Sequence, residues 1–287
     1  MDIRTVAVAG AGTMGNGIAH VFAQKGFDVI LIDPIQESLQ RGTEMIKLNL
    51  ARQVKRELIS KADADGTLAR VKPTGNLKDA ANAQLVVEAI FEDFPIKSRF
   101  WTEMDSICPP DTLFASNTSS LPITQVAATT NRPEKFIGMH FMNPVPVMKL
   151  VEIIRGYSTS DETCKIIKEL AIKLDKTPVE VNDYPGFIAN RILLPMINES
   201  IFALMEGVSG KEEIDTVMKL GMNHPMGPLT LADFIGLDVC LAILETMHSG
   251  LGDPKYRPCP LLKKMVQAGW LGRKSGRGFY VYGSPAN

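Results

Sequence analysis

The chain has 287 residues, of which 45% are hydrophobic and 22% are charged, a balance typical of a folded globular protein and unlike that of a disordered or fibrous one. Its length exceeds the roughly 100 to 200 residues of a common single domain, which predicts two domains. Lysine and arginine total 31 against 32 acidic residues, so no overall charge favours binding to nucleic acid or to an anionic membrane.

Strands and helices alternate through the first half of the chain. Short apolar runs rich in β-branched residues predict strands over residues 5–9, 27–33, 83–90, 112–120 and 135–141. Helical spacing predicts helices within residues 10–26, 37–59 and 96–107. This alternation predicts a parallel sheet with right-handed crossover connections, which is the doubly wound α/β arrangement.

The pattern changes near residues 183–187. From Gly186 to Gly207 the sequence predicts one long apolar helix that contains Pro195, which should bend it. Further helices are expected over residues 230–247 and 261–268. We therefore predict a doubly wound domain over residues 1–184 and an all-α domain over residues 185–287.

A glycine-rich turn follows the first predicted strand. The pattern G-x-G-x-x-G places the first glycine at a tight turn, the second where backbone approaches a pyrophosphate, and the third where helix packs on strand. The amides at the start of the helix can then bind the anion. The predicted cofactor loop contains Gly10, Gly12, Thr13, Met14 and Gly15.

Asp33 ends the second predicted strand, where a carboxylate would accept hydrogen bonds from the adenosine ribose of a dinucleotide. The residues after it, "PIQES", contain no arginine that could hold a 2′-phosphate. This predicts a Rossmann-type domain that binds NAD rather than NADP. The alternative is a glycine turn beside an ordinary surface aspartate.

The segment "GMHFMNPVPVMKLVEII", residues 138–154, contains one histidine and one glutamate among apolar residues and prolines. Burying either group without a partner costs several kcal/mol or favours its neutral form. His140 and Glu152 are therefore candidates for pairing or for chemistry. The alternative for His140 is a core histidine that is satisfied by backbone groups.

No secretion signal is recognisable at the start of the sequence, and no apolar run approaches the roughly 20 residues that span a bilayer. The four cysteines lie far apart and form no CxxC pair or zinc-like spacing with histidine. They are Cys108, Cys164, Cys240 and Cys259. We expect free thiols in the cytoplasm, no metal and no membrane association.

Four segments together closely resemble the L-3-hydroxyacyl-CoA dehydrogenase family. They are "ASNTSSLPI", "GMHFMNPVPVMKLVE", "DYPGFIANRI" and "GMNHPMGP", and the similarity extends over almost the whole chain. Because no hydratase is fused to it, the chain most resembles the short bacterial branch of the family. The resemblance implies reversible hydride transfer between NAD and C3 of a short-chain (S)-3-hydroxyacyl-CoA.

The resemblance assigns His140 as the general base for oxidation and Glu152 as its partner, which would fix the imidazole tautomer and stabilise the imidazolium. In reverse, protonated His140 would donate to the ketone oxygen, so reduction should be favoured at lower pH than oxidation. Ser119 and Asn190 are implied contacts to the reacting oxygen and to the nicotinamide end. Their alternatives are a helix N-cap for Ser119 and a helix-start amide for Asn190.

Further cofactor contacts are also implied by the resemblance. Glu92, Lys97 and Asn117 match the ribose and nicotinamide contacts of the family, although solvated surface charge is the alternative for Glu92 and Lys97. Asn143 lies in the N-P-V corner and either contacts the cofactor or orders that turn.

The predicted helix over residues 37–59 contains Arg52, Lys55 and Arg56, and the resemblance implies that these pair with the phosphates of coenzyme A. Solvated helix charge is the alternative. The apolar faces of the second domain favour a homodimer. Two other functions stay open: a sugar-acid dehydrogenase of the same superfamily that needs no CoA, and a non-enzymatic NAD-binding protein.

Overall fold

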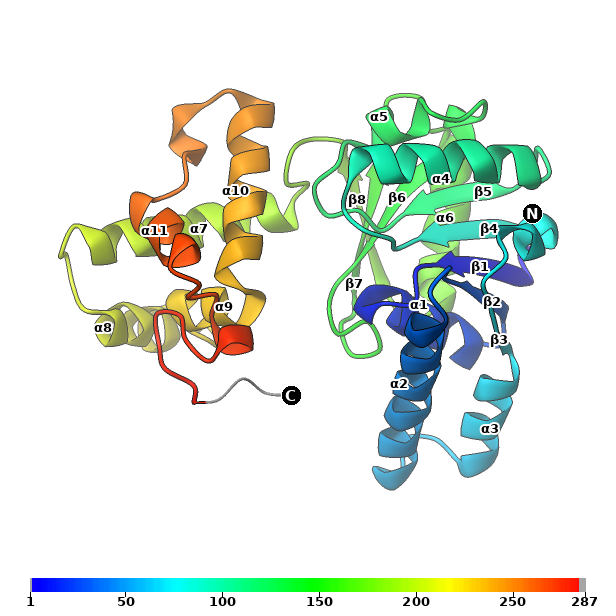
Figure 1. Ribbon diagram of the computed structural model, residues 1–287, viewed down its shortest axis with the longest axis horizontal. Helices are drawn as coiled ribbons and strands as arrows, with labels where there is room; N and C mark the ends of the chain where they lie inside the picture. Colours follow the sequence, from blue (N-terminus) through cyan, green and yellow to red (C-terminus); the bar gives the residue numbers. More distant parts are fainter. Residues whose placement is uncertain (1, 284–287) are drawn as a thin grey trace. The chain divides into compact units, whose positions relative to one another are not determined.

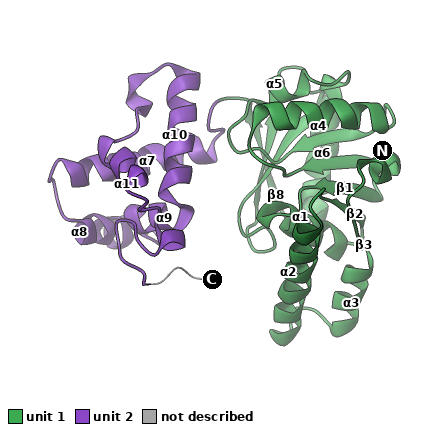
Figure 2. Ribbon diagram, in the orientation of Figure 1, with its two compact units in different colours: residues 1–184 green, residues 185–287 purple. Residues whose placement is uncertain are grey.

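The structure is a computed structural model that describes residues 2–283. The chain divides into two compact units, residues 1–184 and residues 185–287 (Figure 2). Each unit has its own apolar core, and they are described separately.

The first unit is built on one eight-stranded sheet with the order β3-β2-β1-β4-β5-β6-β7-β8 (Figure 1). The strands are β1 (Thr5–Ala9), β2 (Asp28–Ile32), β3 (Val71–Thr74), β4 (Leu85–Glu88), β5 (Leu113–Ser116), β6 (Phe136–Phe141), β7 (Leu150–Arg155) and β8 (Thr177–Asn182). Neighbouring strands run parallel except β6 and β7. The predicted doubly wound α/β fold is therefore confirmed.

Helices cover both faces of this sheet. They are α1 (Thr13–Gln24), α2 (Gln36–Lys55), α3 (Lys61–Ala69), α4 (Phe94–Ile107), α5 (Ile123–Ala127) and α6 (Asp161–Lys173), with 3₁₀ turns η1 (Leu77–Asn82) and η2 (Pro133–Lys135). Ile18 of α1, Ile46 of α2 and Ile167 of α6 share one core with the sheet. On the other face Trp101 of α4 packs against Phe114 of β5.

β7 departs from the fully parallel sheet that the alternating pattern predicts. It pairs with β6 in the antiparallel direction, with His140 directly opposite Glu152. The connection from residue 142 to residue 149 contains no helix, so the chain turns back beside β6 instead of crossing over the sheet. The sheet is therefore parallel on both sides of this one antiparallel pair.

The second unit is helical. Its elements are α7 (Ala189–Met205), α8 (Lys211–Thr216), the π-helical η3 (Val217–Gly221), α9 (Pro228–Ile235), α10 (Leu237–Leu251), η4 (Pro254–Tyr256), α11 (Pro260–Gln267) and η5 (Arg273–Ser275). Pro195 lies inside α7, as expected. The single helix predicted over residues 230–247 is wrong, because Gly236 adopts φ +107° and separates α9 from α10.

The order of the strands indicates where a ligand would bind. β1 lies between β2 and β4, so the chain reverses direction across the sheet at this point. In doubly wound sheets ligands bind beyond the carboxyl ends of the strands at such a switch point. Within the described residues, no helix is both long and apolar enough to cross a membrane.

Candidate active site

The glycine loop lies at the carboxyl end of β1. Gly10 has φ +94° and its amide donates to Ile32 O at 2.7 Å. A Cβ on Gly10 would lie 2.5 Å from Ala89 O, and one on Gly15 would lie 1.7 Å from Gly10 O, so both positions need glycine. A Cβ on Gly12 would meet nothing within 4 Å. Gly12 therefore faces open space where a pyrophosphate can approach the backbone.

Asp33 follows β2 and closes the same loop. Its Oδ2 accepts from Ala11 N and its Oδ1 accepts from Ile35 N, each at 2.9 Å. Thr13 and Met14 form the first turn of α1, where Thr13 is exposed and Met14 is half-buried. The glycine loop and Asp33, which are predicted to hold the dinucleotide, thus lie together around the start of α1. The open space beside Gly12 is compatible with a pyrophosphate at this loop.

A buried cluster of charges lies at the carboxyl end of β4. Lys97, with 1% of its surface exposed, forms ion pairs with Glu88 Oε1 and, at 3.2 Å, with Glu92 Oε2. Glu88 Oε2 also accepts from Ser116 Oγ at 2.8 Å. The alternative of solvated surface charge is therefore wrong for Lys97. Sequence reasoning missed Glu88, although a carboxylate ending the apolar run "LVV" was a usable signal.

Glu92 holds the segment that contains Ser119. Its Oε1 accepts from Thr118 Oγ1 at 2.5 Å, from Ser119 N at 2.9 Å, and from Ser120 N and Oγ at 3.0 and 2.8 Å. Burial opposes the charged form, but Lys97 and these hydrogen bonds together lower the pKa of Glu92 below its usual value. Glu92 is therefore an anion that fixes backbone amides.

Ser119 is not the N-cap of a helix, because α5 begins only at Ile123 and Pro122 occupies the N-cap position. Asn117, two residues earlier, accepts from Phe141 N through its side-chain oxygen at 2.9 Å. This bond ties the end of β5 to the residue after His140.

The histidine and glutamate of the segment over residues 138–154 form a buried pair. His140 Nδ1 lies 2.8 Å from Glu152 Oε2, and the two side chains are 8% and 1% exposed. A carboxylate can only accept, so the bond places the hydrogen on Nδ1 and makes Nε2 the nitrogen that can exchange a proton with a substrate. The antiparallel register of β6 and β7 puts both side chains on one face of the sheet.

The remaining predicted residues lie elsewhere. Asn190 is in the first turn of α7 in the second unit, which agrees with the helix-start alternative. Asn143 is exposed in the connection between β6 and β7, where Val147 N donates to Pro144 O at 3.0 Å.

A cavity of about 810 Å³ in the first unit, the basic cavity, has five basic side chains among its sixteen lining residues. Arg52 and Arg56 border it, whereas Lys55 does not. Sequence reasoning missed the other basic residues of its wall because they are far apart in the chain. They are Lys25, Lys149 and Lys176, set against the single carboxylate of Asp175.

These basic side chains differ in their partners. Lys25 forms an ion pair with Asp175. Lys176 donates to Val145 O and Met148 O at 2.5 and 2.7 Å, and burial lowers the pKa of Lys176. The wall therefore carries more positive than negative charge, as a phosphate site requires.

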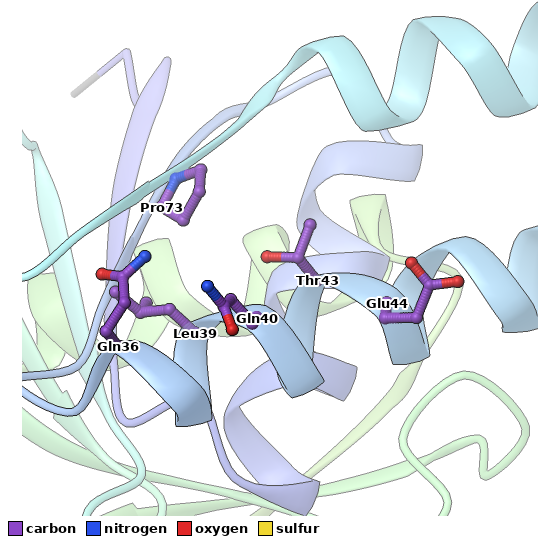
Figure 3. A pocket seen from close by; sticks show the side chains of 6 residues that line it. All are labelled: Gln36, Leu39, Gln40, Thr43, Glu44 and Pro73. Atoms are coloured by element: carbon purple, nitrogen blue, oxygen red, sulfur yellow. The ribbon is translucent and has the colours of Figure 1, made fainter.

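A second cavity, of about 350 Å³, lies between α2 and β3 (Figure 3). Its lining comprises Gln36, Leu39, Gln40, Thr43, Glu44 and Pro73. It contains none of the predicted site residues and no basic group that could bind a phosphate.

The described residues contain no cluster of three or more histidine, cysteine or acidic side chains that could hold a metal. The four cysteines form no disulfide and are buried. Burial raises the pKa of Cys108 to about 11 and that of Cys240 to about 12. Neither thiol is therefore suited to act as a nucleophile at neutral pH.

Comparison with known proteins shows similarity along the full chain. Residues 5–184 match the family described as 3-hydroxyacyl-CoA dehydrogenase, NAD binding domain, and residues 186–282 match its C-terminal domain. A probable 3-hydroxybutyryl-CoA dehydrogenase from Bacillus subtilis is 57% identical over 282 residues, which are 98% of each chain.

A human mitochondrial hydroxyacyl-coenzyme A dehydrogenase is 39% identical, over 98% of this chain and 91% of that one. The crystal structure of (S)-3-hydroxybutyryl-CoA dehydrogenase from Ralstonia eutropha is 48% identical, with a TM-score of 0.97 over 99% of this chain and 100% of that one.

Proposed function

The chain belongs to the 3-hydroxyacyl-CoA dehydrogenase family of NAD-dependent enzymes, and we propose that it interconverts (S)-3-hydroxybutyryl-CoA and acetoacetyl-CoA. The observation that supports this most directly is the buried contact of 2.8 Å between His140 and Glu152. The Bacillus subtilis and Ralstonia eutropha proteins, whose names include 3-hydroxybutyryl-CoA dehydrogenase, match this chain over nearly its whole length.

His140 is the group that moves the proton. During oxidation the substrate hydroxyl loses its proton to Nε2 of His140 while C3 loses a hydride. Glu152, bonded to Nδ1, stabilises the imidazolium that forms and holds the ring in place. In the direction of reduction, Nε2 returns the proton to the ketone oxygen, so reduction should reach its maximal rate at lower pH than oxidation.

Ser119 and Asn190 contact the reacting oxygen and the nicotinamide end in this proposal, because hydroxyl and amide groups can bond both the alcohol and the ketone without changing charge. Gly10, Gly12 and Gly15 with Asp33 hold the dinucleotide at the start of α1. NAD supplies the hydride acceptor when bound.

The basic cavity is the place for the phosphates of coenzyme A. Arg52 and Arg56 on its wall provide guanidinium groups that match phosphate geometry, and Lys149 adds a third cation. Lys55 is left out of this assignment because it does not line the cavity. The substrate of this site is therefore an acyl thioester of a phosphorylated carrier rather than a free acid.

We also propose a cytoplasmic homodimer. The second unit exposes many large apolar side chains, which a second copy could cover. They include Ile192, Val208, Val217, Leu220, Met222 and Phe234. Unpaired cysteines suit a reducing compartment. Sedimentation of the protein checks its mass in solution against the 31.4 kDa of one chain.

The decisive experiment compares acetoacetyl-CoA with free acetoacetate by the loss of NADH absorbance. Two charge-assisted contacts at about 1.5 to 3 kcal/mol each predict a kcat/KM at least about 100-fold higher for the CoA ester. Equal rates would favour a dehydrogenase of free hydroxy acids. Tight NADH binding without turnover of either compound would favour a non-enzymatic NAD-binding protein.

A further inference from the structure

The N-terminus of α5 is capped from a distant part of the chain. Its N-cap residue, Pro122, has no side-chain oxygen to accept from the first amides of the helix. Asp183 supplies both acceptors: its Oδ1 lies 3.0 Å from Ile123 N and its Oδ2 lies 2.7 Å from Thr124 N. One carboxylate therefore fixes two consecutive amides some sixty residues earlier in the sequence.

Asp183 is itself fixed by the sheet. It directly follows β8, and its amide donates to Arg155 O at the end of β7 at 3.2 Å. Its carboxylate therefore projects from the sheet rather than from a long unsupported loop.

α5 lies over the face of the sheet that carries the His140–Glu152 pair. Successive residues of a strand point to opposite faces, so Gly138 and His140 share one face. A Cβ on Gly138 would come within 2.9 Å of Ile123 Cδ1, which places the buried Ile123 of α5 on that face. The helix that Asp183 caps therefore packs two residues from the histidine.

Ser119 lies in the short segment between two carboxylate anchors. Glu92 binds the amides of Ser119 and Ser120, and Asp183 binds the amide of Ile123. Only Leu121 and Pro122 separate the two anchored stretches, and Leu121 N is bonded to the side chain of Thr118 at 2.9 Å. The two carboxylates therefore hold adjoining parts of one short segment, and without the cap only Glu92 and Thr118 would fix the backbone around Ser119.

We propose that Asp183 is a positioning residue of this enzyme. By fixing the N-terminus of α5, Asp183 holds Ser119 where its side chain can contact the substrate. The expected effect of Asp183 on turnover rests on the proposed function, whereas its expected effect on the backbone of the Ser119 segment does not. A misplacement of about 1 Å at a reacting group can cost about 100-fold in rate, so loss of the cap should lower kcat by about 10- to 100-fold.

The first test measures hydrogen exchange in the peptide over residues 117–127 for the wild type and for Asp183→Asn. An asparagine can accept from one of the two amides only and turns an NH₂ group toward the other, so exchange should become about tenfold faster or more. Asp183→Glu restores the carboxylate and should recover part of the protection. Asp63→Asn, which removes a carboxylate from the capping box of α3, is the matched control and should leave this peptide unchanged.

The second test is a double-mutant cycle on acetoacetyl-CoA reduction with Asp183→Asn and Ser119→Ala. If Asp183 acts through Ser119, the double variant should be no slower than Ser119→Ala alone, because the group to be positioned is already gone. Independent structural damage would instead make the two losses multiply. The circular dichroism spectrum of each variant checks that the protein is folded.

Unchanged exchange in the peptide would overturn the proposal, and so would multiplying losses in the cycle. Failure of the wild type to reduce acetoacetyl-CoA would instead refute the proposed function. The exchange measurement would still decide whether Asp183 fixes the Ser119 segment.

Discussion

The buried His20 makes the stability of the first unit depend on pH. His20 lies on α1, the helix that begins at the glycine loop, and none of its surface is exposed. Its Nε2 is 3.3 Å from Gln53 Nε2, and its Nδ1 has no hydrogen-bond partner within residues 2–283. Burial lowers the pKa of His20 from 6.5 to about 4. The folded protein therefore keeps this ring neutral in a range where the unfolded chain binds a proton.

The expected magnitude follows from the shift in pKa. Between pH 6.5 and pH 4 the unfolded state binds more protons than the folded state, so the free energy of unfolding falls as the pH falls through this window. The pKa of His20 is about 4 in the folded protein against 6.5 in the unfolded chain. At about 1.36 kcal/mol for each unit of pKa, this difference lowers the free energy of unfolding by about 3 kcal/mol in total. Above pH 6.5 the ring is neutral in both states and contributes no pH dependence.

The assay compares urea unfolding of the wild type and of His20→Gln at several pH values between 7.5 and 4. Trp101 is the tryptophan of the first unit, so a Trp270→Phe background lets its fluorescence report that unit alone. As the pH falls from 7.5 to 4, the wild type should lose about 3 kcal/mol more of its free energy of unfolding than His20→Gln loses. His248→Gln, at an exposed position of the second unit, controls for the loss of a histidine. A difference that does not vary with pH would refute the reasoning.

Three further predictions concern the site. Glu152→Gln keeps a polar group beside the His140 ring but removes the charge that would stabilise an imidazolium in the proposed reaction. The kcat should therefore fall by at least about tenfold and up to about 10⁴-fold, with NADH affinity unchanged in a fluorescence titration. Arg56→Ala should raise the KM for acetoacetyl-CoA by about tenfold or more and leave the KM for NADH unchanged, since a charge-assisted bond contributes about 1.5 to 3 kcal/mol. Lys47→Ala is the control, because Lys47 lies on α2, which ends at the residue before Arg56, and does not line the cavity. An equal effect of the two substitutions would refute the phosphate site. Lys97→Met leaves Glu88 buried without its cation and should lower the free energy of unfolding by about 3 to 5 kcal/mol in urea, whereas an unchanged midpoint would contradict a charged pair.

The fold could be predicted where one local pattern decides it. Apolar β-branched runs identify β1, β2 and β4, and the glycine spacing identifies the start of α1, because strand burial and tight turns each restrict the residue types at a few adjacent positions. β3 was missed because it is a short edge strand of four residues that contains Pro73. The break at Gly236 was missed because the apolar helical pattern continues on both sides of it.

The residues of the candidate site could likewise be predicted only where a local pattern marks them. His140 and Glu152 could be recognised because each is a polar residue in an apolar run. The burial of Lys97 could not be predicted, because its sequence neighbours in α4 are those of an ordinary exposed helix and its partner Glu88 comes from β4. Lys149 and Asp183 were missed for a related reason: the cavity wall and the cap of α5 form only when distant segments pack together.

The single antiparallel pair in the sheet is what allows a histidine and a glutamate twelve residues apart to act together. The connection between β6 and β7 sets the register in which His140 lies opposite Glu152, and Gly138 opposite Ile154. A slip of one residue would turn one of the two side chains to the opposite face of the sheet, into the apolar core that β6 and β7 share with α1 and α6. A helical crossover would place β7 parallel to β6 and remove this register altogether. The departure from the parallel pattern is therefore the feature of the fold that brings the acid to the imidazole.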